Sequence, residues 1–139
     1  MENTSGKIRI RIKTIQLSDG EKSELINEYD GKLFIKGDAV HIFYNEGDED
    51  NTSCSVRAKH GDVQIVRKGD AVSSKLCFSR GTVYKTAYHT AYGKMALVIK
   101  PSLVLCAVDS QGGKIRLEYD MSLEGQEFFN DVTMYIDPA

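Results

Sequence analysis

Residues 114–123 read KIRLEYDMSL, and hydrophobic and polar side chains alternate along the whole stretch. Ile115, Leu117 and Tyr119 fall at every second position, with charged residues between them. Successive side chains of a β-strand point to opposite faces, so the stretch predicts a strand with one face on a core and one in water. Antiparallel sheets typically have one such buried face and one solvated face.

The same alternation recurs along the chain, beginning with residues 7–13 (KIRIRIK). Glycine pairs separate the alternating stretches and favour the positive φ of tight hairpin turns. These pairs are Asp19-Gly20, Gly37-Asp38, Gly61-Asp62, Gly69-Asp70 and Gly112-Gly113. We therefore expect strands at 7–17, 22–36, 39–46, 52–59, 62–67, 71–79, 82–92, 95–107, 114–123 and 127–136.

Three irregularities are expected within these strands. Gly31 predicts a bend or bulge in the long second strand, because glycine weakens a strand interior. Pro101 predicts a bulge in the eighth strand, because proline cannot donate to the hydrogen-bond ladder. The apolar positions change parity between Ile12 and Ile15, which predicts a further bulge in the first strand.

Residues 83–93 (VYKTAYHTAYG) are compatible with two structures. Tyr84, Tyr88 and Tyr92 recur every four residues, as they would on one face of a helix. The same three residues also fall on one face of a strand. Tyrosine and threonine favour strands, and no helix-capping residue precedes the run, so we predict a strand.

This pattern predicts one all-β domain over residues 1–139, with residues 1–6 as a flexible tail. Ten short strands joined by tight turns favour an antiparallel up-and-down β-barrel of about 8–10 strands, because closure removes open sheet edges. Basic residues of the first strand and acidic residues of the last would seal it as neighbours. They are Lys7, Arg9, Arg11, Lys13, Glu127, Asp131 and Asp137.

The composition argues against several classes of protein. The net charge of −2 lacks the surplus of cations that nucleic-acid binders use, and no aromatic platform accompanies the cations of the first strand. No apolar run is long enough to span a bilayer, and the N-terminus has no signal-peptide core. We therefore expect a cytoplasmic protein with no nucleic-acid or membrane partner.

Metal and cofactor sites are not expected. The three cysteines, Cys54, Cys77 and Cys106, share no metal-ligand spacing and are interpreted as small reduced hydrophobes. The three histidines lie far apart in the sequence. The acidic run at 46–50 lacks the glycine and the final glutamate of a calcium loop.

Several short motifs occur in a recognisable order between residues 7 and 136. They are Tyr44-Asn45-Glu46, Arg67-Lys68-Gly69, Phe78 with Gly81, residues 88–93 (YHTAYG), and Gly113-Lys114-Ile115 leading to Tyr119-Asp120-Met121. In this order the chain resembles the YwiB-like family, small calycin-like β-barrel proteins of unknown function. The resemblance implies a lipocalin-type meander barrel and supplies no activity. Lys100-Pro101 stands where the resemblance implies Lys-Thr, and the proline there cannot donate a hydrogen bond to a neighbouring strand.

A polar cluster is expected at one end of the barrel, because the odd-numbered strands of a meander all end at the same rim. Glu46 ends the third strand and Arg67 the fifth, two strand spacings or about 10 Å apart. The seventh strand brings further hydroxyl groups to this rim. The candidate ligand-binding residues are Tyr44, Glu46, Arg67, Tyr88, Thr90, Tyr92 and Tyr119.

Three functions remain open for this barrel, beside a purely structural ion pair that closes the rim. The first is binding of a small polar or anionic molecule whose apolar part fills the lumen. The second is a protein-interaction or homodimerising barrel with a packed lumen. The third is an enzyme that uses Glu46 as acid or base, which would need a raised pKa. Nucleophile, phosphate-loop and dinucleotide motifs are missing from the sequence, which favours binding over catalysis.

Overall fold

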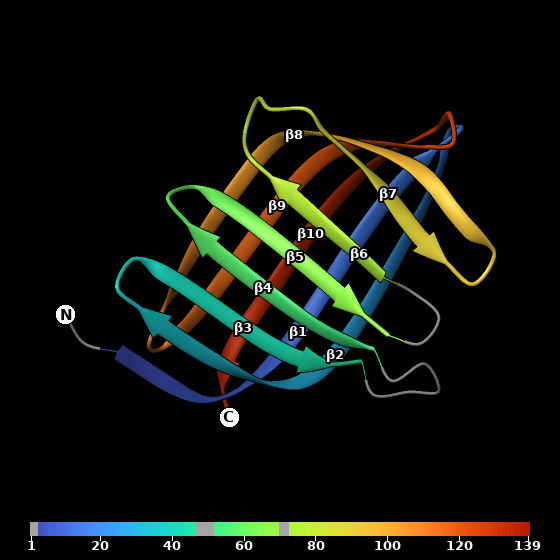
Figure 1. Cartoon of the computed structure of the whole chain (residues 1–139). Coiled ribbons are helices and arrows are strands. Elements are labelled where there is room, and N and C mark those ends of the chain that lie inside the picture. The colour runs from blue at the N-terminus through green and yellow to red at the C-terminus, as the bar shows by residue number, and fades with distance from the viewer. Residues whose placement is uncertain (1–2, 47–51, 70–72) are drawn as a thin grey trace.

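The computed structural model describes residues 3–46, 52–69 and 73–139, and these form ten antiparallel strands (Figure 1). The strands are β1 (Asn3–Ser18), β2 (Glu21–Lys36), β3 (Ala39–Asn45), β4 (Ser53–Lys59), β5 (Asp62–Lys68), β6 (Ser73–Phe78), β7 (Tyr84–Thr90), β8 (Gly93–Asp109), β9 (Gly112–Leu123) and β10 (Gln126–Pro138). All ten predicted strands are present. Residues 84–90 form the predicted strand β7 and not the helix that the spacing of the tyrosines also allowed. Within the described ranges, no helix is long and apolar enough to cross a membrane.

The ten strands close into a barrel in which each strand pairs with its sequence neighbours and β1 pairs with β10. The predicted seal between the first and last strands is therefore correct. Its charge pairing is different, because two of the four β1 cations pair with acids of β2. Arg9 contacts Asp30 at 3.2 Å and Lys13 contacts Glu24 at 3.6 Å. The acids of β10 lie beside β1 without these pairs.

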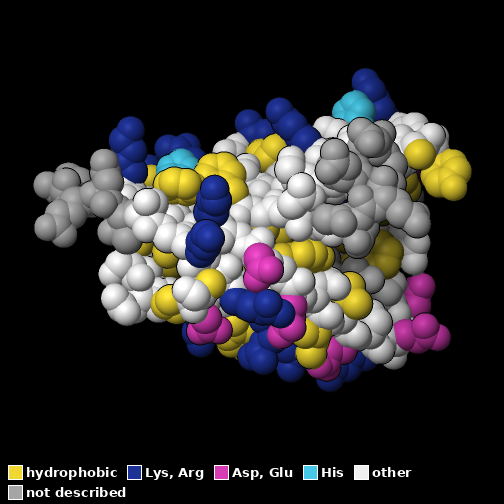
Figure 2. All heavy atoms as spheres, turned by 90° about the horizontal axis from the view of Figure 1, so that it is seen from below, with side chains coloured by type: hydrophobic (Ala, Val, Ile, Leu, Met, Phe, Trp, Pro, Cys, Tyr) yellow, Lys and Arg dark blue, Asp and Glu magenta, His cyan; other side chains and the backbone are white. Residues whose placement is uncertain are grey.

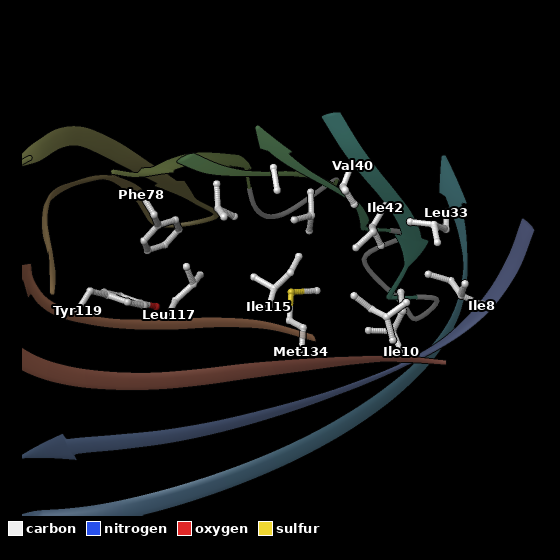
Figure 3. Close-up of a cluster of buried hydrophobic side chains, with 14 of the residues drawn as sticks. Ile8, Ile10, Leu33, Val40, Ile42, Phe78, Ile115, Leu117, Tyr119 and Met134 are labelled. Carbon is white, nitrogen blue, oxygen red and sulfur yellow. The ribbon is translucent and has the colours of Figure 1, made fainter. Parts of the chain in front are cut away.

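The core lies between two crossing groups of strands. In Figure 1, β3–β6 lie in front and cross β8–β10 behind them. Figure 3 shows Ile42 on one wall facing Ile115 and Met134, which are paired neighbours on β9 and β10 in the opposite wall. These three are 0–2% exposed. Each such buried aliphatic side chain contributes roughly 1.5–3 kcal/mol, so this part of the interior is a packed core.

The long strands β1 and β2 differ from the prediction at three places. Residues 3–6 are not a tail, because β1 begins at Asn3 and pairs there with Lys36. The predicted bulge between Ile12 and Ile15 is wrong, since the register of β1 is continuous through both residues. The parity changes because Ile15 is only partly buried and faces the same side as Arg9 and Lys13. Gly31 also stays in register with both neighbouring strands.

Proline and glycine shape the hairpin of β8 and β9. A register shift between Pro101 and Leu103 confirms the predicted bulge. Gly112-Gly113 is not the turn itself, which lies at residues 110–111. Both glycines lie in β9 with φ of 96° and 142°, where side chains are strained. A Cβ atom at Gly113 would also collide with the backbone oxygen of Ala107.

Candidate functional site

A row of inward-facing residues crosses five strands at the barrel mouth where β3, β5 and β7 end. The register aligns Tyr44, Cys54, Arg67, Ser74 and Tyr88 on neighbouring strands from β3 to β7. Among the described residues, one register pair joins β6 to β7, namely Ser73 with His89. This pair places Ser74 opposite Tyr88. We call these five residues and Glu46 the mouth cluster.

A bidentate ion pair between Glu46 and Arg67 is the centre of the mouth cluster. Arg67 Nη2 donates to Glu46 Oε2 at 2.8 Å, and Nε donates to Oε1 at 3.0 Å. The two side chains are 24% and 30% exposed, so the pair is half-buried. The structure thus brings together the two charges that the meander topology placed at one rim. Parallel hydrogen bonds of this kind fix a guanidinium in one orientation.

Cys54 and Tyr44 extend the pair along the row. Cys54 Sγ donates to Glu46 Oε1 at 3.0 Å, and the Tyr44 ring stacks on Tyr29 with centroids 4.9 Å apart. Burial, and then the neighbouring Glu46, raise the pKa of Cys54 to about 11. Burial, with Cys54 and Glu46 beside it, also raises the pKa of Tyr44 well above its usual range. Both groups therefore keep their protons at neutral pH.

Glu46 stays ionised in this setting. Burial alone would raise its pKa, but the hydrogen bonds from Arg67 and Cys54 outweigh burial and lower the pKa below its ordinary value. Hydrogen bonding also outweighs burial at Arg67. Burial alone would lower its pKa, but the bonds to Glu46 raise the pKa above its ordinary value. A general acid needs a raised carboxyl pKa, so the direction found for Glu46 argues against the acid–base hypothesis.

Ser74 is the unusual member of the mouth cluster. Its side chain is buried, with 6% exposure. Its Oγ has no hydrogen-bond partner in the described parts of the chain. Its neighbours in the row are Arg67 and Tyr88, and Arg67 Nη1 contacts the Tyr88 hydroxyl at the long distance of 3.5 Å. A buried hydroxyl with no partner is rare in folded proteins.

Three of the seven predicted site residues do not join this cluster. β7 ends at Thr90 rather than at residue 92, so Tyr92 lies in the following turn and is 100% exposed. The Thr90 hydroxyl is used within that turn, accepting from Tyr92 N and donating to Gly93 O at 3.1 Å each. Tyr119 packs edge-on against Phe78, four residues or about 13 Å along β6 from Ser74.

Sequence reasoning missed three residues of the site. Cys54 was interpreted as a core residue, although a two-residue turn between the predicted strands 52–59 and 62–67 already pairs it with Arg67. Ser74 and Tyr29 gave no such signal, because their partners depend on the exact register. The acidic run beyond Glu46, and the first two residues of the predicted 71–79 strand, lie outside the described residues. The described residues contain no group of three or more potential metal ligands.

Fold and site together define a closed, ten-stranded antiparallel barrel with an apolar core and a polar mouth. The chain belongs to the family described as a domain of unknown function (DUF1934), whose model matches residues 10–136. Its fold is similar to the crystal structure of ywiB protein from Bacillus subtilis, with a TM-score of 0.88 and 21% identity over 97% of this chain and 93% of that one. No curated protein matches the chain. The comparisons confirm the YwiB-like resemblance and assign no activity.

Proposed function

We propose that this protein binds a small polar or anionic molecule at the mouth cluster. The observation that carries the proposal is the buried Ser74 hydroxyl, which lacks a partner among the described residues and lies beside Arg67. Leaving a buried hydroxyl unpaired costs roughly 1–3 kcal/mol. A ligand that supplies the missing partner would recover this cost on binding.

The hydrogen-bonding groups of the cluster favour a ligand with acceptor oxygens. Arg67 gives Nε and one hydrogen of Nη2 to Glu46. A guanidinium has five N–H groups, so further donors remain beside the Ser74 and Tyr88 hydroxyls. A carboxylate, a carbonyl or a phosphate would suit these donors. Because Glu46 neutralises Arg67, a neutral polar ligand fits as well as a small anion.

The packed core limits how deep such a ligand can go. Val56 and Val63 lie two and four residues below the row on β4 and β5, and each is 1% exposed. The apolar part of the ligand was expected to fill the lumen, but here side chains occupy that part of the interior. The proposed ligand is therefore a small molecule, or a short polar end of a larger one, held at the mouth.

Native mass spectrometry of the gently purified protein tests this proposal. We expect a non-covalent adduct on the wild-type chain that is lost on denaturation and is reduced in the Ser74→Ala and Arg67→Met variants. The matched control is Arg116→Met, because Arg116 also makes a cross-strand pair, with Asp131 at 3.3 Å, but on the outer wall. Wild-type protein without any adduct, or equal adducts in the cluster and control variants, would overturn the proposal.

A further inference from the structure

The charged residues of this chain are separated between two walls of the barrel. Exposed cations lie on the outer side of the wall from the second half of β2 to the start of β8, which we call the basic wall. They are Lys32, Lys36, Arg57, Lys59, Lys68, Lys75, Lys85 and Lys94. Figure 2 shows the molecule from below, with Lys, Arg and His side chains along its upper margin and with Asp and Glu side chains lower down, where further Lys and Arg side chains lie among them.

Pairing with carboxylates distinguishes the basic wall from part of the opposite wall. Within the described ranges, none of the eight is in an ion pair. On the opposite wall Arg9, Lys13 and Arg116 are paired with carboxylates, whereas Lys7, Arg11, Lys22, Lys100 and Lys114 are not in ion pairs with described residues. Three described acids lie close to the basic wall. Asp38 faces His60 and Asp62 accepts from Ser79 at hairpin ends, and Asp30 lines the groove beside Lys32 but is paired with Arg9. Among the described residues, the basic wall therefore has a local surplus of positive charge, although the chain has a net charge of −2.

Exposed aromatic rings lie within this charged surface. Phe34 and Phe43 are 39% and 44% exposed and meet edge to face with centroids 5.6 Å apart. The His41 ring is parallel to that of Phe43, at an interplanar angle of 4°. Partial burial, with Arg57 and Lys36 nearby, lowers the pKa of His41 and keeps the ring neutral at physiological pH. Three aromatic rings, those of Phe34, His41 and Phe43, thus lie on β2 and β3 beside the cations.

A groove connects the rings to the lysines. Its volume is about 470 Å³, and its lining includes Phe43, Ser55 and Val66 between Lys32 and Lys68. The register continues the same outer row from Lys32 through Phe43, Ser55 and Val66 to Lys75 on β6. Four strand spacings separate the ends of this row, or about 19 Å. An apolar floor with cations at both ends suits an extended polyanion that also has flat apolar groups.

We propose that the basic wall binds single-stranded nucleic acid, with phosphates on its lysines and a base stacked on Phe43. Single-strand binders combine a cationic path for the backbone with aromatic side chains on which bases stack. Duplexes do not offer their base faces, so the exposed rings favour a single strand. The total charge and the first strand, which argued against a nucleic-acid partner, do not reveal this wall, and two of the four first-strand cations, Arg9 and Lys13, are paired with acids. This second site is on the outer surface, and its groove borders the mouth cluster at Tyr44 and Cys54.

Fluorescence anisotropy with labelled oligouridylate and oligothymidylate of about 12 nucleotides tests the proposal, a length within the range that small barrels bind. We expect binding at about 50 mM salt that weakens steeply toward about 200 mM. Phe43→Ala should weaken binding roughly 5- to 150-fold, the usual effect of losing one stacked base. The Lys32→Ala, Lys75→Ala double variant should lower the slope of log Kd against log salt by roughly 0.7 for each phosphate that no longer meets a lysine.

Matched controls come from the opposite wall, where Lys114→Ala removes a cation and Tyr135→Ala an aromatic ring. Circular dichroism of each variant checks that it is folded. The proposal is overturned if neither oligonucleotide binds at low salt, or if the control variants weaken binding as much as the basic-wall variants do. It is also overturned if phosphatidylserine vesicles bind while Phe43→Ala leaves oligonucleotide binding unchanged, because the wall would then recognise negative charge alone.

Discussion

The hydroxyl of Ser74 lies in a position where a purely structural residue would be alanine. Its side chain is buried, and its Oγ has no partner in the described parts of the chain. Arg67 and Tyr88 flank it, yet they bond to Glu46 and to each other. The residues of the mouth cluster are thus ordered by contacts among themselves and leave the Ser74 hydroxyl without a described partner.

Removal of the Ser74 hydroxyl should have opposite effects on the stability of the protein and on its affinity for the ligand. Ser74→Ala is expected to raise the free energy of unfolding by about 1 kcal/mol, because the cost of a buried unpaired group disappears. The same variant should bind the mouth ligand less tightly. Urea unfolding measures the first effect, with Ser73→Ala as the exposed neighbouring control, which should change stability by less than about 0.5 kcal/mol. A clear loss of stability in Ser74→Ala would show that the hydroxyl has a structural partner.

The Glu46–Arg67 pair predicts a pH dependence of stability with a definite sign. The folded pKa of Glu46 lies below its ordinary value of 4.5, so the unfolded chain takes up the proton more readily. The stabilisation is complete above about pH 4.5 and is lost as pH falls through the folded pKa. Urea unfolding at several pH values should show a smaller acid-side loss in Glu46→Gln than in wild type. Identical pH profiles would show that the pair contributes nothing.

At the scale of the strands, β2 is the element that connects the two crossing groups. It pairs with β1 along its whole length and with β3 only from Gly31 onward. Gly31 is where β3 approaches most closely, because a Cβ atom there would stand 2.5 Å from Phe43 O and 2.9 Å from Ile10 Cδ1. A glycine at this position therefore allows β2 to pair with both β1 and β3 without a bulge.

A side chain at position 31 should accordingly disturb the barrel. Gly31→Ala is expected to lower the free energy of unfolding by about 1–3 kcal/mol, because the contacting oxygen belongs to a paired backbone that cannot move freely. Gly6→Ala in β1 is the matched control, since a Cβ atom at Gly6 meets nothing within 4 Å. It should be neutral or slightly stabilising. Equal stability of the two variants in urea would contradict the close approach.

The sequence predicted elements better than their ends. Period-two alternation located all ten strands, because each strand has one face on the core and one in water. Strand ends depend on turns: the β8–β9 turn lies at residues 110–111 rather than at Gly112-Gly113, and β7 stops at Thr90. That second shift removes Tyr92 from the site. The parity change after Ile12 was mistaken for a bulge because Ile15 is an apolar residue on the outer face.

At the scale of the whole molecule, topology decides which distant residues meet. Barrel closure in sequence order brings the ends of β3 and β5 to one mouth, so the sequence alone was enough to pair Glu46 with Arg67. The sequence alone was not enough to predict the basic wall. Neither the total charge nor the charges of a single strand show which strands lie side by side and present their outer faces together. The molecule has two candidate binding surfaces: a small inner mouth and a broad basic wall.

The most direct test of the mouth as a binding site is a protein-observed NMR titration with acetate, acetamide and inorganic phosphate. The account predicts that at least one of these probes shifts the signals of Arg67, Ser74 and Tyr88 together. The shifts should be weaker in Ser74→Ala and unchanged in Arg116→Met. Shifts confined to surface lysines, or no shifts in the mouth cluster with any of the three probes, would contradict it.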